Sequence, residues 1–232
     1  MIGGPGASPT GMDSTFVLIP GAGGAAWYWH RVVAELERRG RDAIAVELPA
    51  GDDGAGLAEY ADVVVEAIGS RRPVVLVAQS MGGFTAPLVC ERVPVELLIV
   101  VNAMVPLPGE TFNEWWTATG WVEEVGEIDM DDAFFHDVPD DVKAVAMQEE
   151  PPQSGTPLAE PLPLAAWPDV PTRFVQGRED RLFPLSFQRR IARERLGIEV
   201  DEVPGGHLVA LSRPVELVDR LLRLEAEEKV SD

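Results

Sequence analysis

The sequence contains a single cysteine, Cys90, among its 232 residues. One cysteine excludes an internal disulfide and the usual zinc-finger patterns, so we expect no structural metal and a packed, unreactive thiol. The chain has no run of the roughly 18 apolar residues that span a bilayer. Its first residues lack the basic and apolar stretches of a signal peptide. These absences predict a cytoplasmic protein without a membrane span.

Positive charge is also scarce in this sequence. Lysine and arginine number 19 against 39 aspartates and glutamates, which gives a formal net charge of −20. Nucleic acids and anionic membranes are polyanions, so neither is expected as a partner. The apolar fraction of 46% fits a globular protein. The length suits one domain with a full core, and it does not indicate an oligomeric state.

Short Val-rich runs alternate with helical patterns along most of the chain. The runs predict strands at 16–20, 43–48, 74–78, 95–101, 172–177 and 199–203, and the helical patterns predict helices at 26–39, 57–70, 82–92, 185–196 and 215–229. Strands that alternate with helices indicate βαβ units around a parallel sheet. We therefore predict an α/β fold with a largely parallel six-stranded sheet.

Two stretches depart from this alternation. Residues 1–13 are rich in glycine and proline and predict a disordered leader, which leaves 14–232 as a single domain. Residues 104–167 combine tryptophans, an acidic run and clustered prolines. A loop of about sixty residues without structure is uncommon in a compact domain. We interpret 104–167 as a helical insertion that caps the C-terminal edge of the sheet, with helices at 110–122 and 139–149.

The most informative stretch is 74–83, Val-Val-Leu-Val-Ala-Gln-Ser-Met-Gly-Gly. A short buried strand leads directly to Ser80, and glycines open the helix that follows. This is the layout of a nucleophile elbow, a strained turn that lifts a serine hydroxyl above the edge of a sheet. Ala78 replaces the first glycine of the usual Gly-x-Ser-x-Gly and is small enough for the same close approach. A serine before two glycines is also an ordinary helix start, so the interpretation requires partner residues.

A nucleophilic serine needs a base and an acid that orients the base. Of three histidines, His207 lies in a Gly-Gly-His loop directly after the last predicted strand. Asp180 follows the preceding strand, and parallel strands end at one edge of a sheet. We therefore expect both near Ser80. Glu179 is the neighbouring alternative acid, and the acids at 201–202 are less suitable because they lie within or near a strand.

Attack by a serine on a carbonyl creates an oxyanion, which needs two preorganised N–H donors. The residue after the nucleophile, Met81, supplies one backbone N–H. The loop after the first strand supplies the other, and we assign it to Ala22. Gly21 and Gly23 on either side let the backbone approach a ligand closely, so we include them among the substrate-binding residues.

The same glycines support a different hypothesis. Residues 21–26 fit Gly-x-Gly-x-x-Ala between a strand and a helix, and Glu47 ends the next strand. This combination is typical of dinucleotide-binding oxidoreductases. The bulky residues at 27–29 disfavour it, because the helix of that motif must pack closely. It also leaves the serine, aspartate and histidine without a role.

With these residues in place, the chain resembles the α/β-hydrolase superfamily past residue 14, and within it the plant methylesterase and hydroxynitrile lyase group. The sequence from Pro20, Pro-Gly-Ala-Gly-Gly-Ala-Ala-Trp, resembles the group's His-Gly-Ala-x-x-Gly-x-Trp, and Ser-Met-Gly-Gly, Asn-Ala-Met-Val-Pro from Asn102 and Gly-Gly-His resemble its other landmarks. The resemblance implies an α/β-hydrolase fold with strand order 2-1-3-4-5-6. It also implies a triad of Ser80, Asp180 and His207, the two oxyanion donors named above, and no cofactor.

Two departures from the group bear on the reaction. Pro20 stands where its oxyanion loop has histidine, and Leu208 stands where its lyases have a lysine. Without that lysine the lyase interpretation weakens, so we expect hydrolysis of a carboxylic ester or lactone through an acyl-enzyme. A cofactor-free lyase, perhydrolase or oxygenase, and a non-catalytic protein that binds a small ligand, remain the alternatives.

The expected substrate is a small to medium apolar ester. Met104, Leu182 and Leu208 adjoin the predicted catalytic loops, so we expect them in the pocket wall. Trp115, Phe134 and Phe135 belong either to the pocket or to the core of the insertion. The core is favoured because an insertion must bury apolar side chains to fold. His136 lies in the insertion and is included as a residue that could contact substrate.

Overall fold

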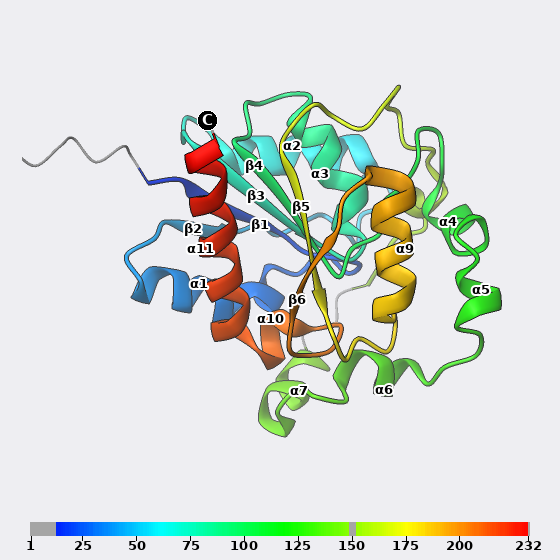
Figure 1. Ribbon diagram of the computed structural model, residues 1–232. Coiled ribbons are helices and arrows are strands. Elements are labelled where there is room, and N and C mark those ends of the chain that lie inside the picture. Colours follow the sequence, from blue (N-terminus) through cyan, green and yellow to red (C-terminus); the bar gives the residue numbers. More distant parts are fainter. Residues whose placement is uncertain (1–12, 149–151, 232) are drawn as a thin grey trace, which may run out of the picture.

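The computed structural model describes residues 13–148 and 152–231 (Figure 1). Apart from Asp13, the predicted leader lies outside these residues. Six strands form one sheet: β1 Thr15–Ile19, β2 Ala43–Ala45, β3 Val74–Gln79, β4 Leu97–Val101, β5 Thr172–Gly177 and β6 Val200–Val203. The order is β2-β1-β3-β4-β5-β6, and every pair is parallel. The predicted order and orientation are confirmed.

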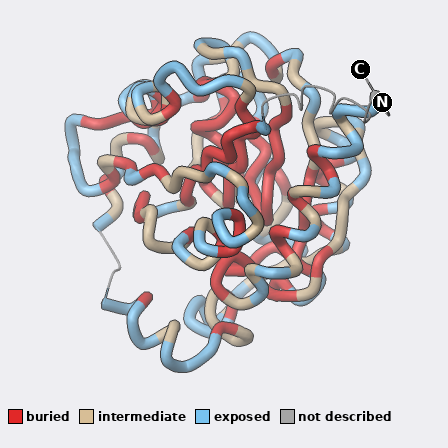
Figure 2. The backbone as a smooth tube through the Cα atoms, turned by 90° about the vertical axis from the view of Figure 1, so that its left-hand side faces the viewer, coloured by how far each residue is buried: buried red, intermediate tan, exposed pale blue. Residues whose placement is uncertain are grey.

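Helices cover both faces of the sheet, which explains why β1, β3 and β4 are buried along their whole length. Helices α1 (His30–Arg38) and α11 (Pro214–Ser231) lie on one face, and α2 (Leu57–Ile68), α3 (Gly82–Cys90) and α9 (Leu185–Leu196) lie on the other (Figure 1). Strand side chains alternate between two core clusters, and Figure 2 shows this buried centre inside a more exposed layer. In the described part of the chain, no helix is both long and apolar enough to cross a membrane.

Between β4 and β5, the described residues form five short helices: α4 Phe112–Ala118, α5 Trp121–Glu124, α6 Met130–Phe135, α7 Asp140–Ala146 and α8 Thr156–Ala159. The helix predicted at 110–122 is divided because Gly120 adopts a left-handed φ of 72°. The one predicted at 139–149 ends at Ala146, and its last residue lies outside the described residues. Helices α6 and α7 lie at the C-terminal ends of the strands (Figure 1).

Three smaller differences from the prediction concern the length of one strand, the start of one helix and one additional short helix. The strand predicted at 43–48 is observed only as Ala43–Ala45. Beyond it the chain leaves the sheet, and the Leu48 N–H donates to the carbonyl of Gly24 at 2.9 Å instead of to a strand. The helix predicted at 26–39 begins as a 3₁₀ turn, η1 (Ala26–Trp29), before α1. A short helix, α10 (Val209–Ser212), lies between β6 and α11 and has no counterpart in the prediction.

Candidate active site

Ser80 occupies a strained turn between β3 and α3. Its φ of 52° lies in the left-handed region, which is uncommon for any residue other than glycine. Its N–H donates to the carbonyl of Val101 at 3.2 Å, and its own carbonyl accepts from the N–H groups of Gly83 and Met104 at 3.1 and 3.0 Å. These bonds hold the turn in place, so the hydroxyl projects beyond the end of the strand. The local geometry is that of a nucleophile elbow.

Two close approaches explain the glycines around this turn. A Cβ on Gly21 would lie 2.9 Å from the Cβ of Ser80, and a Cβ on Gly83 would lie 1.8 Å from the carbonyl oxygen of Met104. Neither position has room for a side chain. The first approach brings the backbone of the loop after β1 next to the Ser80 side chain, and the second packs the start of α3 against the backbone of Met104.

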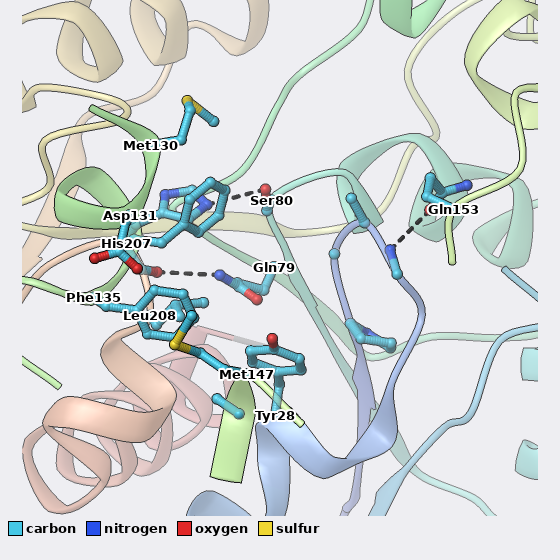
Figure 3. A pocket seen from close by; sticks show the side chains of 16 residues that line it. Tyr28, Gln79, Ser80, Met130, Asp131, Phe135, Met147, Gln153, His207 and Leu208 are labelled. Carbon is cyan, nitrogen blue, oxygen red and sulfur yellow. Dashed lines mark hydrogen bonds between the residues drawn. The ribbon is translucent and has the colours of Figure 1, made fainter. Parts of the chain in front are cut away.

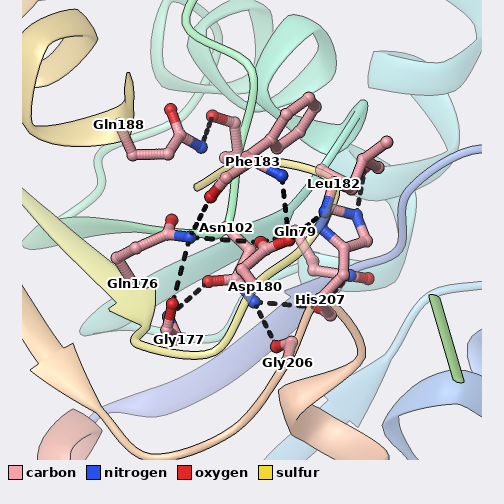
Figure 4. A network of polar contacts seen from close by, with 12 residues as sticks. Gln79, Asn102, Gln176, Gly177, Asp180, Leu182, Phe183, Gln188, Gly206 and His207 are labelled. Atoms are coloured by element: carbon pink, nitrogen blue, oxygen red, sulfur yellow. Dashed lines mark hydrogen bonds and ion pairs between the residues drawn. The ribbon is translucent and has the colours of Figure 1, made fainter. Parts of the chain in front are cut away.

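His207 connects Ser80 to Asp180. Its Nε2 lies 3.1 Å from the Ser80 Oγ, and its Nδ1 lies 3.0 Å from the Asp180 Oδ2 (Figures 3 and 4). The side chains of both His207 and Asp180 are fully buried. An ionised carboxylate only accepts hydrogen bonds, so the ring proton belongs on Nδ1 and the lone pair of Nε2 faces the serine. The structure brings the three predicted residues together in the order that proton transfer from serine requires.

The buried carboxylate of Asp180 has four hydrogen-bond donors. Its Oδ1 accepts from the N–H groups of Leu182 and Phe183, both at 2.9 Å. Its Oδ2 accepts from Gln176 Nε2 at 3.1 Å in addition to His207. A buried charge is tolerated when it is fully hydrogen-bonded, and this arrangement also fixes the carboxylate plane relative to the imidazole.

The alternative acids form hydrogen bonds or ion pairs with other residues. Glu179 accepts from the N–H of Gly205, Asp201 forms an ion pair with Arg220, and Glu202 forms one with Arg189. None of these carboxylates is bonded to His207. The structure therefore favours Asp180 over each of them as the partner of the histidine.

Asn102 is a fully buried residue that supports the site, a role that the sequence pattern does not predict. Its Nδ2 donates to the carbonyls of Gly206 and His207, both at 2.9 Å, and its Oδ1 accepts from the N–H of Gly177 at 2.7 Å (Figure 4). It also has a positive φ of 45°. Gln79 adds a second donor to the His207 carbonyl at 3.1 Å. The loop that carries the histidine is thus tied to the ends of β3, β4 and β5.

The two N–H groups predicted as oxyanion donors remain available. The carbonyl of Gly21 accepts from the N–H of Gly24 at 3.1 Å. Because the peptide between Gly21 and Ala22 is trans, the N–H of Ala22 points in the opposite direction. Within the described residues, neither this N–H nor that of Met81 has a hydrogen-bond partner. Their role in stabilising an oxyanion stays a prediction.

A cavity of about 430 Å³ lies over Ser80 and His207 (Figure 3). The described residues that line it are mostly apolar. They come from the ends of β1 and β3, η1, α6, the end of α7, the segment before α8 and the His207 loop: Pro20, Gly21, Ala22, Gly23, Tyr28, Gln79, Ser80, Met130, Asp131, Phe134, Phe135, Ala146, Met147, Gln153, His207 and Leu208. Gly21, Gly23 and Leu208 line it as expected. The ring of Phe134 meets that of His207 edge-on, with centroids 5.0 Å apart.

Met104 and Leu182 are not among the described residues that line this cavity, so their prediction as pocket-wall residues is wrong. Each adjoins the site in sequence, but each side chain is directed into the core and is no more than 2% exposed. The backbone of Met104 supports the Ser80 turn, and the carbonyl of Leu182 accepts from the indole of Trp121 at 2.7 Å.

Trp115 and His136 are also absent from the cavity wall. Trp115 is fully buried, its indole N–H donates to the carbonyl of Val105 at 3.2 Å, and its ring packs against Phe183. It belongs to the core, which was the other interpretation of this residue. The Nε2 of His136 lies 2.9 Å from the carbonyl of Glu179, and His136 is not among the described residues that line the cavity.

Several residues that line the cavity were not predicted from the sequence. Phe134 and Phe135 were assigned to the core of the insertion, whereas both line the cavity. Tyr28, Met130 and Met147 were not considered for it. A short amphipathic helix buries one side against its neighbours and turns another toward a cavity, and the spacing of apolar residues does not distinguish the two.

Cys90 lies at the end of α3, away from His207, and has no part in this site. Burial raises the pKa of its thiol to about 12, and the neighbouring charge of Glu91 adds to the effect. A thiol with such a pKa is a poor nucleophile. Among the described residues, no group of three or more histidine, cysteine or acidic side chains could hold a metal ion.

The fold and the arrangement around Ser80 agree with the family to which the sequence is assigned. Residues 16–220 match the model of the alpha/beta hydrolase family. This covers most of the chain, and the protein belongs to that family.

Relatives of the chain include "Probable esterase PIR7A" from Oryza sativa subsp. indica, 25% identical over 258 residues that cover 91% of this chain and 97% of the relative. "Methylesterase 7" from Arabidopsis thaliana is 35% identical over 104 residues, 39% of this chain and 40% of the relative. Among solved structures, polyneuridine aldehyde esterase has a TM-score of 0.77 at 21% identity and covers 92% of this chain and 100% of its own. A pyrethroid hydrolase from Sphingobium faniae has a TM-score of 0.72 at 20% identity, covering 92% and 97%.

Proposed function

We propose that the protein hydrolyses a small to medium apolar carboxylic ester or lactone through an acyl-enzyme on Ser80. The observation that carries the proposal is the pair of hydrogen bonds that links Ser80 through His207 to Asp180 beneath an apolar cavity. Family membership supports hydrolysis in general, and relatives named esterase and methylesterase support an ester as substrate. The proposed chemistry needs no cofactor.

In the proposed reaction, the Ser80 Oγ attacks the carbonyl carbon as His207 Nε2 removes its proton. The negative charge that develops on the carbonyl oxygen is stabilised by the N–H groups of Ala22 and Met81. The tetrahedral intermediate collapses when the imidazolium protonates the leaving alkoxide, and an acyl-Ser80 ester remains. Asp180 holds the imidazole in the required tautomer and stabilises its charged form.

Deacylation repeats the same steps with water as the nucleophile. His207 accepts a proton from the water, whose oxygen attacks the acyl carbon, and the same N–H groups stabilise the second tetrahedral intermediate. When the intermediate collapses, His207 returns the proton to Ser80. The free acid leaves, and the enzyme is restored.

The composition of the cavity supports an uncharged substrate. No lysine or arginine is present among the described lining residues, and Asp131 contributes a carboxylate at the wall. That carboxylate is paired with Lys143 at 2.6 Å, so a substrate with its own carboxylate would meet no unpaired cation among the described lining residues. Phe134, Phe135 and Leu208 provide apolar surface next to the reacting serine.

The other hypotheses have less support. Leu208 lines the cavity at the position where the related lyases have lysine, so a leaving anion would lack a cation there. Glu47, which the dinucleotide hypothesis assigns to a ribose, accepts instead from the N–H of Ala26 at 2.6 Å. A perhydrolase or a binding protein would share the residues around Ser80, so these are distinguished by assay.

The test is a panel of p-nitrophenyl, methyl and lactone substrates assayed with the wild type and Ser80→Ala. We expect turnover by the wild type and a loss of about a millionfold in the variant, as in serine hydrolases that depend on such a triad. Hydrolysis by Ser80→Ala at the wild-type rate would refute the mechanism. A wild-type chain that binds these esters and turns over none would support the binding-protein alternative.

A further inference from the structure

We infer that Gln153 is a positioning residue that holds the loop carrying the Ala22 oxyanion donor, and that it acts from the far end of the insertion. The inference rests on the proposed function, because an oxyanion donor has a role only if Ser80 forms tetrahedral intermediates. Its basis is one contact: the N–H of Gly23 donates to the Gln153 Oε1 at 2.8 Å, across 130 positions in the sequence (Figure 3).

This contact fixes the peptide on one side of Ala22. The peptide on the other side is fixed by the bond from the Gly24 N–H to the Gly21 carbonyl. Gly23 and Gly24 have φ values of 82° and 68°, and glycine rotates freely between such conformations. Without Gln153, only the bond within the loop would hold the Ala22 N–H in its direction. The side chain thus supplies the second constraint.

The orientation of the Gln153 amide follows from its partners. The Gly23 N–H can only donate, so the amide oxygen must face it. The amide nitrogen then donates to the carbonyl of Ser154 at 2.9 Å and to the hydroxyl of Tyr60 at 3.2 Å. Burial raises the pKa of Tyr60, which keeps its hydroxyl neutral at ordinary pH. All three contacts are satisfied in one amide orientation only.

The segment that carries Gln153 is itself held firmly. The N–H of Ser154 donates to the carbonyl of Ala50 at 2.6 Å, and its hydroxyl donates to Asp53 at 2.8 Å. Thr156 adds a bond from its hydroxyl to the Asp53 carbonyl at 2.9 Å. Gln153 therefore projects from a segment bound to the loop after β2. It is a fixed support for the oxyanion loop and not a freely moving side chain.

Glu47 is the only other side chain in the described part of the chain that bonds to a backbone N–H of residues 20–26. It bonds at Ala26, where η1 begins, four residues after Ala22. Gln153 bonds at the residue immediately after Ala22. Between the two, Gln153 is the one placed to control the direction of the oxyanion donor.

The test compares Gln153→Met, which keeps the length of the side chain but cannot hydrogen-bond, with the matched control Gln148→Met. Gln148 is exposed and does not line the cavity. Gln153→Met should lower kcat for p-nitrophenyl butyrate by about ten- to a hundredfold, less than the loss on deleting an oxyanion donor itself, with KM little changed. The control should keep the wild-type kcat.

A second readout separates positioning from general damage. An aryl trifluoromethyl ketone forms a tetrahedral adduct whose oxyanion needs the hole, whereas the parent methyl ketone binds the same cavity largely without forming one. Gln153→Met should weaken inhibition by the fluorinated ketone by the factor that it lowers kcat and leave the parent ketone unaffected. Equal weakening of both, or a raised KM with unchanged kcat, would overturn the inference.

Tyr60→Phe provides a milder variant in case Gln153→Met does not fold. It removes one partner of the Gln153 amide at a position that does not line the cavity. It should lower kcat by a smaller factor at constant KM, and an unchanged kcat in a folded Tyr60→Phe would count against the inference. A wild-type protein that hydrolyses none of the esters would overturn the proposed function first, whereas an active wild type with an equally active Gln153→Met would overturn only the role of Gln153.

Discussion

Gly21 lies against Ser80 so closely that a Cβ at position 21 would be 2.9 Å from the serine Cβ and 3.4 Å from its Oγ. The two residues come from the ends of β1 and β3, which are neighbours in the sheet. This approach places the oxyanion loop beside the nucleophile. The parallel sheet therefore does more than support the site, because its strand order determines which loops meet at the serine.

Gly21→Ala should impair catalysis more than folding. The added methyl group must displace the Ser80 side chain or the loop, and a misplacement of about 1 Å at a reacting group can cost about a hundredfold in rate. Gly155→Ala is the matched control, because its φ is −72° and, among the described residues other than its chain neighbours, no heavy atom lies within 4 Å of a Cβ placed there. Steady-state kinetics with p-nitrophenyl butyrate measure the effect, and a Gly21→Ala enzyme as active as the control would contradict the geometry.

Asp180→Asn should lower kcat by about 10⁴-fold if this triad behaves like characterised ones. The amide donates toward the histidine, which places the ring proton on Nε2 and removes the base that faces Ser80. Glu179→Gln serves as the control, since a Gln oxygen can still accept from the Gly205 N–H. If Glu179→Gln were the inactive variant and Asp180→Asn the active one, the acid would have been assigned to the wrong residue.

Substitution of Trp115 should affect stability, whereas substitution of Phe134 should affect substrate binding. Trp115→Phe removes a core hydrogen bond and part of a ring, so the free energy of unfolding should fall by about 1–3 kcal/mol while KM is unchanged. Phe134→Ala should raise KM because Phe134 lines the cavity. Urea denaturation measures the stability of both variants, and steady-state kinetics measure their KM. A raised KM in Trp115→Phe would indicate that Trp115 contacts the substrate.

Glu225 should make folding sensitive to acid. Burial alone would raise the pKa of its carboxyl, but hydrogen bonds from Arg41 and Lys229 outweigh burial and lower the pKa below its ordinary value of 4.5. A lowered folded-state pKa stabilises the protein above the unfolded-state pKa, and that contribution is lost as pH falls through the folded-state pKa. Glu225→Gln should therefore be less stable than wild type at pH 7, and the gap should narrow below about pH 4.5. A gap that stays constant from pH 7 to pH 3 would contradict this prediction.

The sequence was sufficient to predict the sheet and the residues around Ser80 because each depends on local pattern and on topology. Val-rich runs predict strands, and parallel strands bring Ser80, Asp180 and His207 to one edge. The side chains that line the cavity could not be predicted in this way. Met104 and Leu182 are next to site residues in sequence but face the core, because the direction of a loop side chain depends on tertiary packing.

The contacts that support the site could not be predicted from the sequence either. Gln153 meets Gly23 across 130 positions, and Asn102 meets His207 across 105. Neither pair has a signature in residue spacing. In the sequence, Asn102 belongs only to a stretch that resembles a family landmark. Its three hydrogen bonds depend on the folded arrangement of the ends of β4 and β5 and the histidine loop.

The most direct test of the central claim is labelling with a fluorophosphonate, which reacts covalently with an activated serine, followed by peptide mapping by mass spectrometry. We predict one adduct per chain, located on Ser80, with labelling abolished in Ser80→Ala and strongly reduced when His207 is replaced by alanine. An unlabelled wild-type protein that is folded, or an adduct on another residue, would contradict the assignment of Ser80 as the nucleophile.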